Sequence, residues 1–327
     1  MNARLLTQDH AMGEIIALAG TIAPSRASVL IQAERGSGKG LLATEIHSRS
    51  TRSSRPVLAV RCAGVPSNLI EQELFGYEKD SFDGALESTA GKFELAQGGT
   101  LVLDEVGELD SRLQAKLLRA LQDGEIERMG ARRSIKIDIR LITTSSRNLS
   151  EAVKRGQFRE DLYQRLSVVT LTLPRLQDRP GDVRYLAEQF IRSAAEQYKK
   201  PVSGISQEAI SMLELHQWPE NVRELKQVID RAVAGSQNML LQSKDIQITR
   251  TNISQTIDMM PEAVHLDSSN KNAWEPGATL NDIERNVILQ ALSFHHGNRT
   301  HTAKALGISI RTLRNKLAEY RKLGIEA

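Results

Sequence analysis

The sequence predicts an α/β fold, a mostly parallel sheet with helices on both faces, followed by a helical subdomain and a C-terminal helix-turn-helix. A glycine-rich turn over 33–40 lies between an apolar run and a helical stretch. Apolar strands then alternate with helices, and the segment from Leu280 to Ala327 combines short helices with a basic charge balance. Strands that alternate with helices form doubly wound sheets, which bind ligands at the carboxyl ends of their strands.

Composition places the chain among soluble globular proteins. Its 327 residues, 40% hydrophobic and 25% charged, suffice for two or three folded units. No apolar run approaches membrane-spanning length, and the N-terminus is too polar for a signal peptide. Cys62 is the only cysteine, so we expect a cytoplasmic protein without disulfides or membrane contact. Apolar spacing from Met12 to Ile22 predicts a helix beside the first strand, and because nothing precedes it we expect no N-terminal sensory domain.

The glycine-rich turn is close to a phosphate-binding P-loop. It follows the apolar run Ser28–Ile31 and opens a helix, so that backbone N–H groups and a helix N-terminus point at one place. Its residues are Ala33, Glu34, Arg35, Gly36, Ser37, Gly38, Lys39 and Gly40. Ala33 replaces the first glycine of the pattern, and Gly40 removes the hydroxyl that usually touches Mg²⁺, whereas Lys39 keeps its place for the outer phosphates. Alone, the turn leaves open a surface turn with a solvated lysine.

The segment Gly98–Glu105 agrees with phosphate chemistry. Its apolar residues predict a buried parallel strand that ends in two adjacent carboxylates. A P-loop enzyme needs an acid for Mg²⁺ and a base for water at this edge, and we assign Asp104 to the first role and Glu105 to the second. The alternative, a helix N-terminus, is disfavoured because the next helix begins only at Ser111.

Further strands over Val57–Val60 and Ile137–Thr144, with an amphipathic helix over 111–123 between them, complete the alternation. The second strand ends in the polar residues Ser145, Ser146 and Arg147 at the ligand edge.

Arginines mark the end of the α/β part. Arg159 and Arg165 lie six residues apart on one helical stretch. An arginine stabilises charge on a transferring phosphoryl group, also from a neighbouring subunit, and the alternative is ion pairing with Glu160 and Asp161. From Asp182 to Val233 the pattern is helical throughout, including a helix that starts at Pro219 and carries Arg223.

The C-terminal segment concentrates positive charge, with eight Lys and Arg against four Asp and Glu from Leu280 onward. A helix over 284–294 precedes two more over 300–306 and 310–317, joined by the tight turn 307–309. Two short helices joined in this way form a helix-turn-helix, whose second helix enters the major groove of DNA. The alternative is a plain three-helix interaction module.

The second helix of this motif divides into two faces. We expect Ser309 to cap it and Ile310, Leu313 and Leu317 to face the core. The other side chains are candidates for contacts with bases and phosphates: Arg311, Thr312, Arg314, Asn315 and Lys316.

From about residue 5 to 235 the chain resembles the AAA+ module of bacterial enhancer-binding proteins, the ATP-driven activators of sigma-54 RNA polymerase. Motifs match this family in order and spacing at Glu73–Gly76, Gly98–Glu105, Phe158–Leu162, Trp218–Pro219 and Asn221–Leu225. The last segment is similar to the Fis-type domain that ends most of these proteins and dimerises on palindromic sites. With a polar linker, this gives an AAA+ α/β ATP-binding subdomain over 1–172, an AAA+ helical lid over 173–249, a linker over 250–278 and a Fis-type domain over 279–327.

The resemblance implies ATP and Mg²⁺ as cofactors, and an active site between subunits of a ring that is usually a hexamer. It assigns the ATP phosphates to Lys39, Mg²⁺ to Asp104, the attacking water to Glu105, the arginine fingers of the next protomer to Arg159 and Arg165, and the nucleotide sensor of the lid to Arg223. Ser146 stands where the family has a sensor Asn.

Several positions depart from the family. Its sigma-factor loop reads Gly-Ala-Phe-Thr-Gly-Ala, and the matching residues here are Asp80, Ser81, Phe82, Asp83, Gly84 and Ala85. Phe82 is either an exposed contact residue at the loop tip or a ring tucked into the protein. In a six-membered ring the Asp83 carboxylates repel one another unless they face a basic partner.

Other departures concern catalysis. Gly40 replaces a usual Glu, and Arg61 stands where an Asn beside Cys62 holds the catalytic Glu in check. Losing an amide that orients water or Glu105 slows turnover without abolishing ATP binding, because positioning and binding are separable.

We therefore predict a cytoplasmic DNA-binding regulator that acts on sigma-54 RNA polymerase from upstream palindromic sites through an ATP-driven ring, as a homo-oligomer between dimer and hexamer. Two alternatives stay open. One is an ATP-binding modulator, or a mixed-ring partner of a related activator, with little sigma-54 remodelling of its own. The other is an AAA+ chaperone-like ATPase outside transcription, which predicts no specific DNA site.

Overall fold

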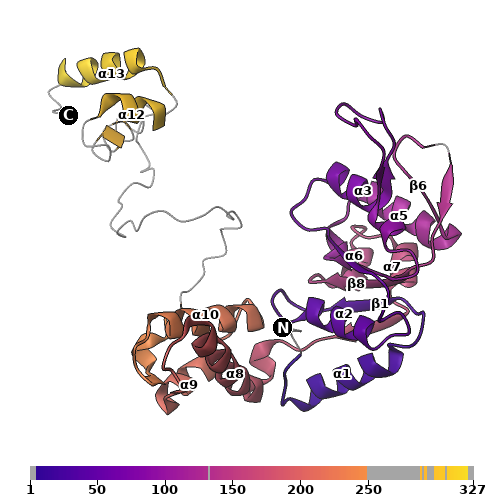
Figure 1. Ribbon diagram of the computed structural model, residues 1–327, viewed down its shortest axis with the longest axis horizontal. Coiled ribbons are helices and arrows are strands. Elements are labelled where there is room, and N and C mark those ends of the chain that lie inside the picture. Colours follow the sequence, from indigo (N-terminus) through magenta and orange to yellow (C-terminus); the bar gives the residue numbers. More distant parts are fainter. Residues whose placement is uncertain are drawn as a thin grey trace. The chain divides into compact units, whose positions relative to one another are not determined.

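The computed structural model describes residues 5–131 and 133–248, and in the C-terminal region residues 288, 291–292, 298–305 and 308–322. The chain forms two compact units, Met1–Thr251 and Asn252–Ala327 (Figure 1). The predicted linker over 250–278 lies outside the described residues. Among the described residues, no helix combines the length and hydropathy that crossing a membrane requires.

A five-stranded parallel sheet forms the centre of the first unit, with strand order β2-β5-β8-β1-β9. Its strands are β1 (Val29–Gln32), β2 (Val57–Arg61), β5 (Thr100–Asp104), β8 (Arg140–Ser145) and β9 (Val169–Thr172). β5 and β8 are buried almost throughout because each lies between two strands and under helices, which explains the apolar run at the centre of β5. The chain pairs β1 with β8 on one side and β9 on the other, so β1 ends at the switch point where such sheets bind ligands.

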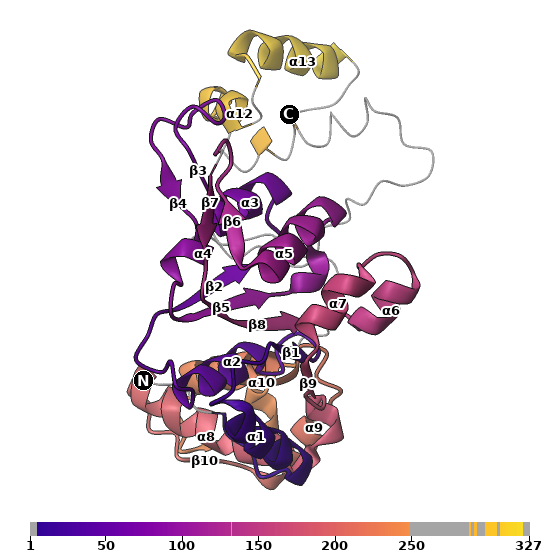
Figure 2. The same ribbon diagram turned by 90° about the vertical axis from the view of Figure 1, so that its right-hand side faces the viewer.

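Helices cover both faces of the sheet, as predicted (Figures 1 and 2). Val29 and Ile31 of β1 pack against α1 (His10–Ile22) and α2 (Lys39–Ser48), whereas Leu30 belongs to the core on the opposite face. This alternation follows from the period of two in a strand. The opposite core is built from α3 (Ser67–Phe75), α4 (Lys92–Leu95), α5 (Ser111–Asp123), α6 (Leu149–Lys154) and α7 (Glu160–Leu166).

One predicted boundary in this part is wrong. The strand predicted over 137–144 begins only at Arg140, whose N–H donates to the carbonyl of Gly99 just before β5 starts. Residues 137–139 belong to no strand and follow the hairpin of β6 (Glu125–Glu127) and β7 (Ser134–Lys136). The helix predicted over 111–123 is confirmed as α5, and its N-cap is Asp110, because an Asp110 carboxylate oxygen accepts the N–H of Leu113 at 2.8 Å.

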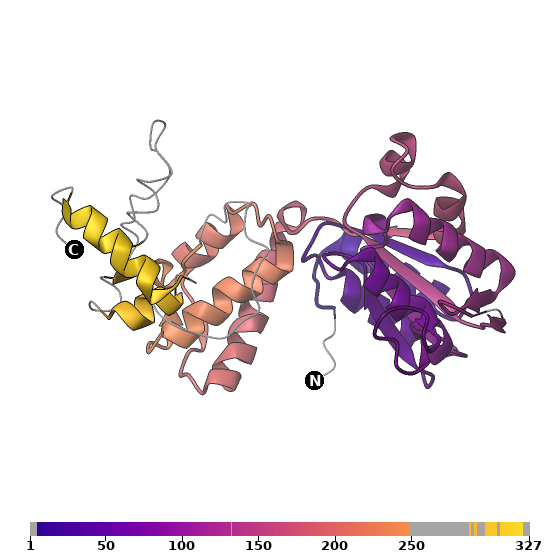
Figure 3. The ribbon, with the colours of Figure 1, turned by 90° about the horizontal axis from the view of Figure 1, so that it is seen from above.

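The helical subdomain lies to one side of the sheet (Figure 3). It contains α8 (Pro180–Tyr198), α9 (Gln207–Glu214) and α10 (Asn221–Gly235). The predicted unbroken helical pattern is wrong, because the strand β10 (Gly204–Ile205) interrupts it and pairs with β11 (Leu240–Leu241). Short 3₁₀ turns add η1 (Val106–Glu108), η2 (Leu176–Asp178) and η3 (Ser243–Asp245).

The start of α10 also differs from the prediction of Pro219. Trp218 and Asn221 adopt positive φ values of 51° and 52°, and the Trp218 carbonyl accepts the Asn221 N–H at 2.7 Å. This tight turn carries Pro219 outside the helix. The buried Trp218 ring secures the turn, since its Nε1 donates to the carbonyl of Leu213 at 2.9 Å.

The second unit contains α12 (Arg299–Ala305) and α13 (Ile310–Lys322). Leu313 and Leu317 are buried as predicted, whereas the side chain of Ile310 lies outside the described residues. The predicted cap is confirmed, because Ser309 Oγ accepts the N–H of Thr312 at 3.0 Å. Of the helix predicted over 284–294, the structure describes only residues 288, 291 and 292, all helical.

Candidate nucleotide-binding site

The turn between β1 and α2 has the shape of a phosphate cradle. Gly36 and Gly38 adopt φ values of 76° and 105°, which residues with a side chain rarely take up. The helix α2 opens directly behind them at Lys39. The N-terminus of this helix and the N–H groups of the turn therefore lie where an anion binds.

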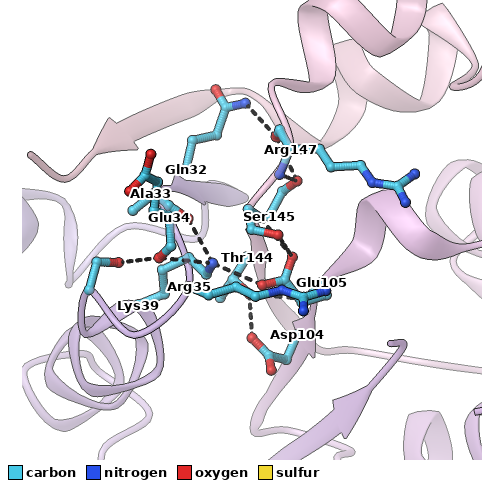
Figure 4. A network of polar contacts seen from close by, with 12 residues as sticks. Gln32, Ala33, Glu34, Arg35, Lys39, Asp104, Glu105, Thr144, Ser145 and Arg147 are labelled. Carbon is cyan, nitrogen blue, oxygen red and sulfur yellow. Dashed lines mark hydrogen bonds and ion pairs between the residues drawn. The ribbon is translucent and has the colours of Figure 1, made fainter. Parts of the chain in front are cut away.

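Lys39 joins this turn to the acid pair at the end of β5 (Figure 4). Its side chain is buried, and Nζ donates to the carbonyl of Ala33 at 2.7 Å and to Glu105 Oε1 at 2.8 Å. A buried ammonium group is stable only with such partners. The structure thus brings together the lysine and the carboxylate that the sequence assigned to one site.

The carboxylate of Glu105 is also held by Ser146, the residue directly after β8. Its Oε2 accepts the N–H of Ser146 at 2.7 Å and the hydroxyl of Ser146 at 2.8 Å. Burial raises the pKa of Glu105, but the hydrogen bonds from Lys39 and Ser146 outweigh it and hold the pKa below its ordinary value. The carboxylate is therefore ionised at neutral pH.

Thr144 is a site residue that the sequence reasoning missed. Its hydroxyl donates to Asp104 Oδ1 at 2.5 Å and accepts the N–H of Glu105 at 3.1 Å, so that one side chain orients both acids. The signal was present, because Thr144 lies near the carboxyl end of β8, directly before the polar residues 145–147.

Asp104 is suited to bind a Mg²⁺ whose other ligands are phosphate oxygens of the nucleotide and water. Among the described residues, no three acidic, histidine or cysteine side chains gather as a metal cluster. Mg²⁺ at phosphates is commonly held by one or two carboxylates together with phosphate oxygens and water. Asp104 at the edge of the cradle matches that donor set, whereas Gly40 offers no hydroxyl.

The helical subdomain lies directly on the cradle. The buried Asn221 donates from Nδ2 to the carbonyl of Arg35 at 3.1 Å, and the N–H of Arg223 donates to the carbonyl of Gly36 at 3.2 Å. A Cβ on Gly36 would lie 1.9 Å from the carbonyl oxygen of Glu220, so only glycine permits this approach. Arg223 thus stands beside the turn with its side chain exposed. Asn221 belongs to a motif that the chain shares with the family, but no role at the site was predicted for it, because its position depends on the positive-φ turn before α10.

A cavity of about 440 Å³ adjoins the cradle. It is lined by Glu34, Arg35, Ser146, Arg175, Gln177, Gln217 and Pro219. Because Ser146 also binds Glu105, the cavity borders the acid pair.

Arg159 and Arg165 are not brought to this site. Arg159 is the N-cap residue of α7 and not part of the helix, and its guanidinium forms two hydrogen bonds with Asp161, at 2.7 and 3.0 Å. Arg165 donates to the carbonyl of Leu121 on α5 at 2.9 Å. In the described part of the chain, neither arginine contacts the glycine-rich turn or the acid pair.

The loop over 80–85 lies between the short strands β3 (Gly76–Tyr77) and β4 (Thr89–Ala90). Phe82 is half-buried, and its ring stands edge-on to Tyr77 with centroids 5.0 Å apart. Asp83 is exposed, whereas Ala85 is buried. The largest exposed apolar side chain here is Leu86, 81% exposed, which the sequence reasoning missed.

The base of this loop is fastened to the hairpin of β6 and β7, which runs beside it in Figure 2. Arg128 makes two hydrogen bonds of 2.7 Å to Glu94 and one of 3.2 Å to Glu78. Hydrogen bonds from Arg128 hold the pKa of Glu94 below its ordinary value, so this contact is ionic at neutral pH.

In the second unit, α13 presents polar side chains on one face. Arg311, Thr312, Arg314 and Asn315 are exposed, and Lys316 is half-buried. These are the residues that the sequence assigned to DNA.

Family profiles match three consecutive segments of the chain. They are described as Sigma-54 interaction domain over residues 5–172, AAA+ ATPase lid domain over 177–259, and Bacterial regulatory protein, Fis family, over 279–320. The first alone spans just over half of the chain.

Individual relatives agree with these profiles. The transcriptional regulatory protein FlbD of Caulobacter vibrioides is 44% identical, over 98% of this chain and 71% of FlbD. The regulatory protein AtoC of Escherichia coli is 42% identical, over 97% of this chain and 67% of AtoC. The crystal structure of NtrX from Brucella abortus with ADP is similar at a TM-score of 0.69 and 29% identity, over 98% of this chain and 69% of NtrX. The chain therefore belongs to the sigma-54-dependent transcriptional regulators, in which an AAA+ ATPase module precedes a Fis-type DNA-binding domain.

Proposed function

We propose that this regulator binds ATP with Mg²⁺ in the turn over 33–40, hydrolyses it at a site completed by a neighbouring subunit, and drives sigma-54 RNA polymerase from upstream palindromic sites. The 2.8 Å contact between Lys39 and Glu105 is the observation that carries the proposal. A phosphate-binding ammonium and a base for water must meet at the carboxyl edge of the sheet for this chemistry. The crystal structure of NtrX in complex with ATP, 28% identical at a TM-score of 0.68, supports the choice of nucleotide.

The residues of one subunit take separate roles. Lys39 turns from Glu105 to the outer phosphates, and the freed carboxylate, still held by Ser146, orients the attacking water. Asp104 holds the Mg²⁺, whose charge offsets that of the phosphate oxygens. Arg223 responds to the nucleotide from the helical subdomain.

Arg159 and Arg165 act on the nucleotide of the next subunit. Both are exposed, and neither contacts the site of its own chain in the part that the structure describes. A guanidinium supplied in trans is worth 10³–10⁵ in turnover in phosphoryl transfer. This arrangement requires a ring, for which we propose a hexamer of identical subunits.

Mixing two inactive variants tests catalysis in trans. Lys39→Ala removes the cradle and keeps the arginines, whereas Arg159→Ala keeps the cradle and removes an arginine. Each variant alone is expected to lose ATP turnover, and their equimolar mixture to regain about a quarter of the wild-type rate, the share of interfaces that pair an intact cradle with an intact arginine.

The matched control mixes Lys39→Ala with Glu105→Gln, because both changes lie on the cradle side and no interface is restored. Recovery in this control, or none in the first mixture, contradicts catalysis in trans.

On the DNA side, we propose that Arg311, Arg314 and Asn315 read base edges while Thr312 and Lys316 contact phosphates, with Ser309 fixing the helix start. Two copies then bind the halves of a palindrome. Membership in the family decides against the chaperone-like alternative.

The modulator alternative stays open because of one exposed acid, Asp83, in place of the family's Thr. If the loop alone is at fault, Asp83→Thr forms open complexes with sigma-54 holoenzyme where the wild type forms few. Glu87→Thr, which removes a neighbouring exposed acid, is the matched control and is expected to stay near wild type. Open-complex formation by the wild-type protein alone, unchanged in Asp83→Thr, contradicts the modulator role.

A further inference from the structure

Arg35 brings an uncommitted guanidinium to the cradle. Its side chain is exposed and forms no ion pair among the described residues. Neighbouring cations are engaged: Lys39 with Glu105 at 2.8 Å, and Arg175 with Glu34 at 3.0 Å. Glu34, the acid next to Arg35, is already paired with Arg175. The exposed guanidinium of Arg35 can therefore bind an incoming anion.

The backbone of Arg35 is fixed although its side chain is not. Asn221, itself fully buried, holds the Arg35 carbonyl at 3.1 Å, and the next residue, Gly36, lies against Glu220. In the view of Figure 4 the side chain extends from the turn toward the acid pair. Because the backbone is already fixed, binding a ligand has to order only the side chain, which lowers the entropy lost.

Arg35 also shares a cavity with Ser146. Both line the space of about 440 Å³ beside the cradle, and Ser146 donates to Glu105. Lys39 marks the outer end of the bound phosphates by its contact with Glu105. The cavity is therefore next to the position of the terminal phosphate, and Arg35 reaches it from the same subunit.

We propose that Arg35 contacts the terminal phosphate of ATP in its own subunit and makes the site select ATP over ADP. The inference rests on the proposed function of the cradle. A guanidinium forms paired, charge-assisted hydrogen bonds with phosphate oxygens. ADP lacks the terminal phosphate, so the contact discriminates between the two nucleotides.

The test compares ATP and ADP affinity by calorimetry in the full chain with Mg²⁺, in a Glu105→Gln background that prevents hydrolysis during titration. Arg35→Ser is expected to weaken ATP binding about tenfold, the equivalent of one paired contact, and to leave ADP binding within about twofold. Arg35→Lys keeps the positive charge but loses the forked pair of donors. Its ATP affinity is therefore expected to lie between those of the Glu105→Gln parent and of Arg35→Ser.

Arg155→Ser is the matched control. Arg155 is 68% exposed at the end of α6, and within the described part of the chain it pairs with Glu151 alone, at 3.3 Å. Its loss is expected to change neither affinity. An unchanged thermal midpoint shows that each variant is folded.

The outcomes separate this inference from the function on which it rests. If the Glu105→Gln parent binds neither nucleotide, the proposed function fails. If the parent binds both and Arg35→Ser leaves the ratio of ATP to ADP affinity unchanged, whether by equal loss or by none, the inference alone is overturned. At an ATP concentration well below saturation, a mixture of Arg35→Ser with Lys39→Ala is expected to turn over ATP no faster than the same amount of Arg35→Ser alone, and a faster rate overturns action within one subunit.

Discussion

Glu105→Gln is expected to lower ATP turnover by about 10²–10⁴-fold while ATP affinity stays within a few-fold of wild type. Glutamine preserves the size of a side chain that is only 8% exposed, and its oxygen still accepts hydrogen bonds from Ser146. What it removes is the negative charge that orients and activates water. Lys39 loses its carboxylate partner but gains the phosphate, so binding survives. Phosphate release gives the turnover, and calorimetry gives the affinity.

Glu108→Gln is the matched control for this experiment. Glu108 lies three residues further along, on η1, and pairs with Arg147 at 2.8 Å. Because it has no contact with Lys39, its replacement is expected to change turnover by less than about twofold. Wild-type turnover in Glu105→Gln, or loss of ATP binding, contradicts the role of Glu105.

The pH dependence of Glu105 has a definite sign. Because its pKa is lowered in the folded protein, the stabilisation from its contact with Lys39 is complete above the ordinary pKa of a glutamate and is lost as pH falls through the folded-state value. Protonation of Glu105 is therefore not expected to reduce ATP turnover near neutral pH.

The sequence predicted those parts of the site that lie at strand ends. An apolar run that closes in Asp104 and Glu105 is buried and parallel, and a glycine-rich turn after another such strand must lie at the same edge of the sheet. Nothing beyond local pattern and the geometry of parallel sheets is needed for Lys39 to meet Glu105.

Contacts between distant segments could not be predicted in this way. Asn221 reaches the cradle across 186 residues of sequence, after a turn with two positive φ values that a pattern of helical residues does not indicate. Asp182 binds the hydroxyl of Thr7 across 175 residues. Arg159 and Arg165 are proposed to act on the neighbouring subunit, so their position at the site cannot be read from a single chain. Such features follow from tertiary packing, which overrides local preference.

The buried carboxylate of Asp182 is the basis of the largest stability effect that we expect. It is 0% exposed and accepts hydrogen bonds from Thr7 Oγ1 at 2.7 Å and Gln8 N at 2.6 Å. Asp9 N, at 3.2 Å, and Arg179 Nη1, also at 3.2 Å, complete its partners. One side chain of α8 thereby holds the segment that leads into α1.

Asp182→Ala is expected to lower the free energy of unfolding of the first unit by about 3–5 kcal/mol. The change leaves the Arg179 guanidinium, only 2% exposed, without its counter-charge, and it leaves the N–H groups of Gln8 and Asp9 without an acceptor. Burial already lowers the pKa of Arg179, and Asp182 is the charge that opposes this shift. Urea unfolding followed by far-ultraviolet circular dichroism measures the loss.

Two further variants show how much of the lost stability comes from the unpaired buried charge. One removes an exposed ion pair on the same helix, and the other removes both buried charges. Glu188→Ala breaks an exposed ion pair with Arg184 on α8 and is expected to cost less than about 1 kcal/mol. Arg179→Met combined with Asp182→Leu removes both charges, so it is expected to recover the part of the loss that comes from an unpaired buried guanidinium, while the N–H groups of Gln8 and Asp9 remain without their acceptor. If Asp182→Ala is no less stable than Glu188→Ala, the anchoring of the N-terminal segment by α8 is refuted.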